Sequence, residues 1–177
     1  PFSANPVDLF RWQNQFNPSP YAAYLDTGET SIVSASPEMF LTIHDDEIST
    51  QPIKGTRPRS VGGVDGERFN RSQYQDLLDS EKEQAELNMV IDLERNDLHR
   101  ICRPGTVSVS QPRTIEPYPT LFHAVATVRG FLRRPLSTCG LSHFCDILGA
   151  VFPGGSITGA PKIRAMQIIE ELETFRR

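Results

Sequence analysis

Strand-like runs fill the segment from residue 21 to residue 53, and their order constrains the fold more than any other feature of the chain. Turn residues or a Ser-Pro break separate four apolar or alternating runs: YAAYL (21–25), TSIVSAS (30–36), PEMFLTI (37–43) and EISTQPI (47–53). Runs of this kind are typical of strands. The pattern predicts an antiparallel meander, preceded by a short helix over residues 7–16.

The pattern changes after residue 69, where apolar residues recur at helix-compatible intervals. One long helix is expected from about Asn70 to Cys102, ending before Pro104 and Gly105. Strands are expected over residues 106–110 and 123–132. On the second of these, three residues should share one face: Ala124, Ala126 and Val128.

Two further helices complete the expected order of elements. One covers residues 141–151, and the last has Pro161 in its first turn. Four apolar residues should give the last helix a packing stripe: Ile163, Met166, Ile169 and Leu172. Antiparallel strands with helices set apart in sequence predict an α+β fold, with largely antiparallel sheets flanked by helices.

Composition excludes several classes of protein. A chain of 177 residues with 38% apolar content is long enough to bury a core. A formal charge of −4, without a basic cluster, argues against a nucleic-acid partner. Cys102, Cys139 and Cys145 are odd in number and lack CxxC spacing, which predicts no disulfide framework, no zinc site and a reducing cytoplasm. No signal peptide or membrane-spanning run is present, so no membrane association is expected.

The stretch QPIKGTRPR places Lys54 where a strand is expected to end and a glycine turn to begin. A lysine amine has an ordinary pKa of about 10.4, so it is a nucleophile at neutral pH only where burial or nearby cations lower that pKa. Arg57 and Arg59 lie close in sequence, and the turn at Gly55 and Thr56 allows a close approach to a ligand. From the residues alone, this lysine is either a solvated charge or a nucleophile.

A glycine-rich turn, FPGGSITGAPK, precedes the last helix. Backbone N–H groups at such a turn favour a carboxylate or phosphate. Gly154 and Gly159 have the spacing of a P-loop, but APK follows where K[ST] is required and no strand directly precedes the first glycine, so a nucleoside triphosphate site is excluded. The turn is either a carboxylate site or an ordinary entry into a helix.

An acidic pair lies on the long predicted helix. Glu83 and Glu86 are three residues apart and share a face, as two carboxylates must to hold a hard cation such as Mg²⁺. A solvated acidic face, with Glu81 and Lys82 beside it, is the alternative. Helix-end capping and local ion pairs account for the polar residues that follow: Asp92, Arg95, Asn96 and Asp97.

Together, these motifs resemble the chorismate-utilising enzymes. Five segments carry the resemblance across nearly all of the chain: SPE (36–38), PIKGTRPR (52–59), AELNMVIDLERNDL (85–98), FHAVATVRG (122–130) and FPGGSITGAPKIRAMQIIEELE (152–173). In this family, the PI-x-GT motif has alanine at x in anthranilate synthase component I and lysine in aminodeoxychorismate synthase component I. The presence of Lys54 favours the second, which forms 4-amino-4-deoxychorismate on the way to p-aminobenzoate and folate.

The resemblance implies a role for each matching residue. Lys54 would attack chorismate at C2, and Glu38 would protonate the departing C4 hydroxyl. Glu86 and Glu83 would hold Mg²⁺, and a glutamine amidotransferase partner would supply ammonia. Seven residues would line the substrate pocket, with Lys162 supporting the anionic part: Gly55, Thr56, His123, Gly155, Ser156, Thr158 and Gly159. Ala126 departs from the serine of many relatives, which puts a polar contact on that strand in question.

The resemblance also implies a partial domain. Residues 1–177 match the catalytic domain without the family's C-terminal part, which brings a further metal-binding glutamate and an arginine, and without most of its N-terminal part. We therefore expect a fragment of the family's sandwich that is inactive by itself. Anthranilate synthase component I, another chorismate enzyme, or an inactive chorismate-binding or subunit-docking module are the alternatives.

Overall fold

The structure, a computed structural model, describes residues 5–174 apart from the side chains of residues 138 and 139, and it divides into two units at Met39. In the first unit, α1 (Pro6–Phe16) begins with a proline, and the Asn5 side chain caps it by accepting a hydrogen bond from the backbone N–H of Val7 at 2.9 Å. β1 (Tyr21–Asp26) and β2 (Ser31–Ser36) form an antiparallel hairpin.

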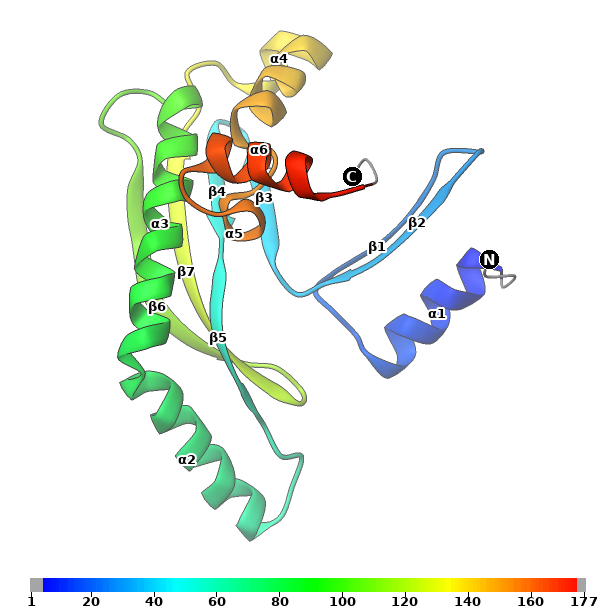
Figure 1. Cartoon of the computed structure of the whole chain (residues 1–177), viewed down its shortest axis with the longest axis vertical. Coiled ribbons are helices and arrows are strands. Elements are labelled where there is room, and N and C mark those ends of the chain that lie inside the picture. Colours follow the sequence, from blue (N-terminus) through cyan, green and yellow to red (C-terminus); the bar gives the residue numbers. More distant parts are fainter. Residues whose placement is uncertain (1–4, 175–177) are drawn as a thin grey trace. The chain divides into compact units, whose positions relative to one another are not determined.

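The second unit is built on a five-stranded sheet, shown with its helices in Figure 1. Its strands are β3 (Met39–His44), β4 (Glu47–Gln51), β5 (Ile53–Pro58), β6 (Ser108–Pro117) and β7 (Leu121–Phe131). β7 is central, because β4 and β5 pair with successive parts of one edge, at Thr50↔Val128 and Thr56↔His123. Val128 also pairs with Val109, so β6 lies on the opposite edge of β7.

The prediction of one continuous meander over residues 21–53 is wrong. β1 and β2 form their own two-stranded sheet, and β4 pairs with β7 as well as with β3. The predicted fourth strand also ends early, because Pro52 separates β4 from β5 and a proline has no N–H for a strand ladder. The antiparallel pairing and the mixture of helices and strands agree with the predicted α+β class.

Two helices replace the single helix predicted over residues 70–102. α2 (Val64–Asp79) ends and α3 (Glu81–Ile101) begins at Ser80, whose backbone is extended. Its side chain accepts a hydrogen bond from the N–H of Glu83 at 3.4 Å, which caps α3. The predicted periodicity is present, but a serine N-cap divides it.

Three helices follow β7: α4 (Leu136–Val151), α5 (Gly155–Thr158) and α6 (Lys162–Leu172). Gly140, with φ 64°, kinks α4, so the regular part after it matches the predicted helix over residues 141–151. Pro161 is the N-cap of α6 rather than its first residue. The predicted packing stripe of α6 is wrong in this structure, since Ile163 is 74% exposed and no described element buries this face.

The core of the second unit lies between β7 and the helices α3 and α4. α3 runs along β6 and β7 (Figure 1). The predicted face of β7 is confirmed, because Ala124, Ala126 and Val128 are fully buried. The main core joins these elements through a shared apolar cluster: Ile48, Leu87, Ile91, Leu98, Cys102, Ala126, Val128, Leu132, Ile147, Ala150 and Val151. Within residues 5–174, every helix is too short or too polar to cross a lipid bilayer.

Candidate active site

Lys54 lies inside a strand. The predicted strand end is wrong, because β5 continues to Pro58. Between the pairs Ile53↔Val125 and Thr56↔His123, β5 advances three residues while β7 advances two. The extra residue is a β-bulge, and bulges change the direction of side chains beside functional sites.

Gly55 makes this bulge possible. Its φ is 92°, a conformation that residues with a side chain rarely adopt. A Cβ at this position would lie 2.8 Å from Leu77 Cδ1 and 3.1 Å from Glu83 Cβ. The backbone beside Lys54 therefore packs directly against the end of α2 and the start of α3.

The amine of Lys54 reaches the glycine-rich turn. Lys54 Nζ donates a hydrogen bond to the backbone carbonyl of Ser156 at 3.4 Å, and the lysine is half-buried. The two residues are 102 positions apart in sequence. The structure thus brings together two of the residues expected at the site, one from β5 and one from α5.

Thr56 and His123 form a second contact within the sheet. They are register partners on β5 and β7, and Thr56 Oγ1 and His123 Nδ1 are joined by a hydrogen bond of 2.9 Å. His123 is 7% exposed, and its ring meets the ring of Tyr118 edge-on with the centroids 5.0 Å apart. The imidazole is consequently held in one orientation next to the bulge.

The predicted acidic pair lies on the first two turns of α3. Glu83 and Glu86 are less exposed than Glu81 and Lys82, as expected for a distinct face. Lys82 Nζ lies 3.6 Å from the Glu86 carboxylate, whose side chain is 42% exposed. Two carboxylates on successive turns supply the hard oxygen ligands that Mg²⁺ prefers. Among the described residues, no group of three or more His, Cys, Asp or Glu side chains is arranged for a metal ion.

Arg57 occupies the neighbourhood of Glu83. Its Nη1 atom lies 3.6 Å from Glu83 Oε1, and its Nε atom forms an ion pair with Asp76. The hydrogen bond to Asp76 raises the pKa of Arg57, and attraction to Glu83 adds to the rise. A permanent positive charge therefore follows Lys54 on β5 and neutralises one carboxylate of the predicted pair.

The glycine-rich turn is more structured than predicted. It contains the one-turn helix α5 before α6 begins. Thr158 Oγ1 donates a hydrogen bond to the Gly154 carbonyl at 3.2 Å, and Gly159 has φ 111°. Gly155 is buried, and its N–H donates to Glu94 Oε1 at 3.2 Å. The expected pocket residues of this turn therefore lie on a short segment fastened to α3.

Sequence reasoning missed Glu94 and misplaced the partner of Asp97. The two are only 5% and 3% exposed, and Asp97 forms an ion pair with Lys162 of α6 rather than with a neighbour on its own helix. Glu94 and Asp97 continue the apolar spacing of Leu87 and Ile91 on the buried face of α3. A carboxylate inside an apolar stripe is the signal that could have identified both.

Glu38 belongs to the first unit. It precedes β3, and its backbone N–H donates to Ser36 Oγ at 3.2 Å, while the Ser36 hydroxyl donates to the Glu38 carbonyl at 3.0 Å. The sequence SPE thus forms a compact turn that fixes its own backbone. The expected action of Glu38 together with Lys54 stays a prediction.

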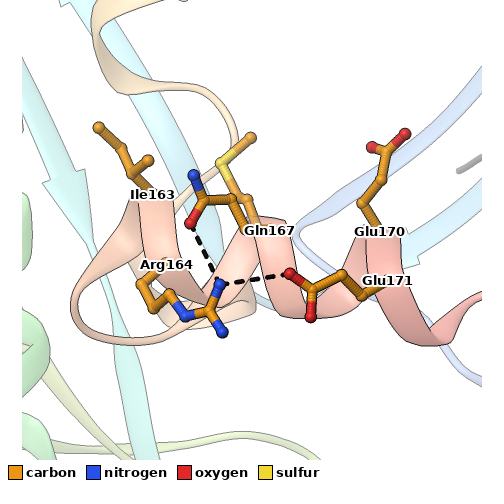
Figure 2. A pocket seen from close by; sticks show the side chains of 6 residues that line it. Ile163, Arg164, Gln167, Glu170 and Glu171 are labelled. Atoms are coloured by element: carbon orange, nitrogen blue, oxygen red, sulfur yellow. Dashed lines mark hydrogen bonds and ion pairs between the residues drawn. The ribbon is translucent and has the colours of Figure 1, made fainter.

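A hollow on the described surface runs along α6, and Figure 2 shows side chains that line it. It has a volume of about 640 Å³, and all its lining residues come from this one helix: Ile163, Arg164, Met166, Gln167, Glu170 and Glu171. Arg164 Nη1 donates to Gln167 Oε1 at 3.4 Å and to Glu171 Oε1 at 3.3 Å. None of the expected site residues lines this hollow, so it is separate from the cluster around Lys54.

Comparisons with known proteins identify the family to which this chain belongs. A family model described as chorismate binding enzyme matches residues 1–177. Anthranilate synthase component 1 of Thermus thermophilus is 46% identical over 180 residues, which cover 100% of this chain and 36% of that protein. Aminodeoxychorismate synthase component 1 of Klebsiella aerogenes is 45% identical over 168 residues, which cover 95% of this chain and 35% of that protein.

A solved structure has the same fold. The crystal structure of anthranilate synthase component I from Streptococcus pneumoniae TIGR4 matches with a TM-score of 0.79 at 35% identity, over 99% of this chain and 36% of that one. This match confirms the predicted fold class. The chain spans about a third of the length of the curated relatives that it matches.

Proposed function

Because the chain belongs to the family of chorismate binding enzymes, we propose that the protein carrying it is component I of an aminodeoxychorismate synthase. Such an enzyme converts chorismate and ammonia to 4-amino-4-deoxychorismate for p-aminobenzoate and folate synthesis. Sequence identity does not distinguish the two kinds of relative, since it is 46% to the anthranilate synthase component 1 and 45% to the aminodeoxychorismate synthase component 1. The observation that carries the choice is Lys54, the lysine form of the PI-x-GT motif, half-buried on a bulge and directed at the glycine-rich turn.

The proposed reaction is a double displacement on the ring. Lys54 Nζ forms a bond to C2 of chorismate while both double bonds of the ring shift and the C4–O bond breaks. Glu38 gives a proton to the departing hydroxyl, which leaves as water, since hydroxide is a poor leaving group. Ammonia then forms a bond to C4, both double bonds shift back, and the bond between C2 and Nζ breaks to release the lysine.

The neighbours of Lys54 are proposed to hold the substrate. Ser156 and the backbone of the turn face the lysine amine, and Gly55 allows the bulge that directs Lys54 toward that turn. Thr56 and His123 would contact the substrate together, because the hydrogen bond between them keeps either side chain from moving alone. Gly155, Thr158 and Gly159 would complete the pocket around the substrate carboxylate.

Mg²⁺ is the proposed cofactor, and the oxygen ligands of Glu86 and Glu83 suit it. When bound there, the ion would supply a positive charge for a chorismate carboxylate and so help to orient the ring. Glu86 is the proposed direct ligand, with Glu83 acting through water. Each carboxylate has one basic group at 3.6 Å, but the Glu86 side chain is 42% exposed and that of Glu83 only 17%, so Glu86 is the carboxylate that is more open to a cation.

Glu86→Gln is expected to raise the Mg²⁺ concentration for half-maximal rate at least about tenfold. Glu81→Gln is the control, because Glu81 is a carboxylate on the preceding turn of α3 and is exposed. Titration of the rate with Mg²⁺ and calorimetric titration of the metal without substrate would measure the effect. Equal shifts in the two variants would make this segment a solvated acidic face.

A glutamine amidotransferase subunit or domain is the proposed source of ammonia, in keeping with the name component 1 of the relatives. The proposed setting is the cytoplasm. Anthranilate synthase component I is the second candidate, because relatives with that name are as similar to this chain as those named aminodeoxychorismate synthase. An inactive chorismate-binding or subunit-docking module is the candidate outside the enzymes.

Product analysis separates these candidates. The intact protein is incubated with chorismate, ammonia and Mg²⁺, and the products are identified by mass spectrometry. A product with the mass of 4-amino-4-deoxychorismate would support the proposal, and anthranilate with release of pyruvate would favour the second candidate. Chorismate binding without any product would leave the inactive module.

A further inference from the structure

Two buried carboxylates of α3 hold the two ends of the glycine-rich turn. Glu94 Oε1 accepts the N–H of Gly155 at 3.2 Å, near the start of the turn. Asp97 forms an ion pair with Lys162, at the end of the turn. Both carboxylates are on one face of α3, and neither is more than 5% exposed. The turn is thus fixed to one rigid helix at two places.

Because both carboxylates are buried, each needs a hydrogen bond or an opposite charge. A carboxylate removed from water is costly unless hydrogen bonds or an opposite charge compensate it. The Lys162 side chain is itself only 15% exposed, and besides meeting Asp97 its Nζ atom donates to the Val151 carbonyl at 3.3 Å. Lys162 therefore joins α3, the end of α4 and the start of α6, so its position is set from three sides.

Close packing reinforces the contact at Gly155. A Cβ on this residue would lie 2.9 Å from Leu93 Cβ and 3.3 Å from Glu94 Oε1. Only glycine therefore lets the backbone come near enough to α3 for the hydrogen bond to Glu94. The next residue is Ser156, whose carbonyl accepts the hydrogen bond from Lys54 Nζ. The residue fixed by Glu94 and the residue that contacts the proposed nucleophile are therefore adjacent in sequence.

We propose that Glu94 and Asp97 are positioning residues, which fix the glycine-rich turn so that the Ser156 carbonyl directs the Lys54 amine. This inference rests on the proposed function for the role of Lys54 as nucleophile. Neither carboxylate touches the substrate in this proposal. Glu94 acts through the Gly155 N–H, and Asp97 acts through Lys162.

The test compares Glu94→Ala with Glu94→Gln in the intact protein. The glutamine amide oxygen can still accept the Gly155 N–H, so this variant should keep kcat within about threefold. Glu94→Ala should lower kcat about tenfold to a hundredfold with a smaller change in KM, because small displacements of reacting groups have effects of this size. Asp92→Ala is the matched control, as Asp92 is an exposed carboxylate on α3 that pairs only locally with Arg95.

Two further measurements do not depend on turnover. The chain has three lysines, Lys54, Lys82 and Lys162, so reductive methylation followed by mass spectrometry reports on each one separately. In Glu94→Ala, Lys54 should be methylated faster relative to exposed Lys82, and amide hydrogen exchange over residues 152–162 should accelerate. Gly155→Ala changes the donor residue of the same hydrogen bond, so it should also speed methylation of Lys54 and exchange of the turn. It serves as the test variant if Glu94→Ala does not fold.

Each result has a distinct meaning. Unchanged methylation of Lys54 in folded Glu94→Ala or Gly155→Ala would overturn the proposal, and so would faster exchange of the turn with unchanged kcat. Recovery of both kcat and the methylation rate in Glu94→Gln would support it. If the unaltered protein makes no product from chorismate, the proposed function fails, and methylation and exchange still decide whether Glu94 positions the lysine.

Discussion

Lys54→Ala is expected to lower formation of 4-amino-4-deoxychorismate by about a thousandfold or more, the scale on which enzymes depend on a nucleophile or its proton-transfer partner. Without the amine, no bond to C2 can form, and the displacement at C4 must occur in one step. Product analysis of the variant would also show whether the remaining activity shifts toward an anthranilate-type product. The rate is measured with ammonia in excess, so that delivery of ammonia does not limit it.

Lys54→Arg is the informative control. An arginine keeps the positive charge and can donate to the Ser156 carbonyl, but its guanidinium stays protonated and cannot act as a nucleophile. If the lysine serves only to attract a carboxylate, the arginine variant should retain much of the rate. If the lysine forms the covalent bond, the arginine and alanine variants should fail alike.

Direct capture of the adduct completes this test. The unaltered protein is mixed with chorismate and Mg²⁺ without ammonia, and its intact mass is measured. A mass increase of chorismate less one water, located on the peptide that carries Lys54, is the expected result. Absence of the adduct together with normal turnover of Lys54→Ala would exclude the covalent role.

Local sequence signals predicted the helices and strands well where one type of residue dominates. β7 illustrates this, because its alternating residues Ala124, Ala126 and Val128 were predicted to share one face and are all fully buried. The failures occurred where a single polar or special residue overrides a periodic pattern. Ser80 divides a long helix by capping its second half, and Pro52 divides a strand by lacking a donor.

The site was predicted in part, and the part that was missed depends on contacts between distant residues. A motif could identify Lys54 and Ser156 as candidates, but their contact joins β5 to a turn 102 residues away. Glu94 and Asp97 were missed because an acidic residue on a helix is normally solvated, and only tertiary structure shows that these two are buried. The bulge at Gly55 was missed for a similar reason, since it appears only in the register between β5 and β7.

Gly55→Ala is the second substitution with a large expected effect, this time on stability. Two costs add at this position. An alanine at φ 92° is strained by about 1–2 kcal/mol, and forcing its Cβ against Leu77 and Glu83 adds about 1–3 kcal/mol, as overpacking of close-packed regions usually does. The free energy of unfolding, measured by urea denaturation, should therefore fall by about 2–5 kcal/mol.

Gly105→Ala separates the two costs. Gly105 has φ 78°, close to the value at Gly55, but a Cβ there would meet no atom within 4 Å. This control should therefore lose only the strain contribution, about 1–2 kcal/mol. The difference between the two variants in the free energy of unfolding measures the cost of packing a Cβ at the bulge against α2 and α3.

The same pair of variants tests whether the bulge positions Lys54. Leu77 is fully buried, so we expect the contact to be relieved by a movement of β5 away from α2, and this movement carries Lys54 with it because Lys54 is adjacent to Gly55. Under conditions where both variants remain folded, kcat should fall at least about tenfold in Gly55→Ala and stay near its original value in Gly105→Ala. Equal loss of stability in the two variants, with kcat unchanged in Gly55→Ala, would mean that Leu77 and Glu83 adjust at no cost and that the lysine does not depend on the glycine beside it.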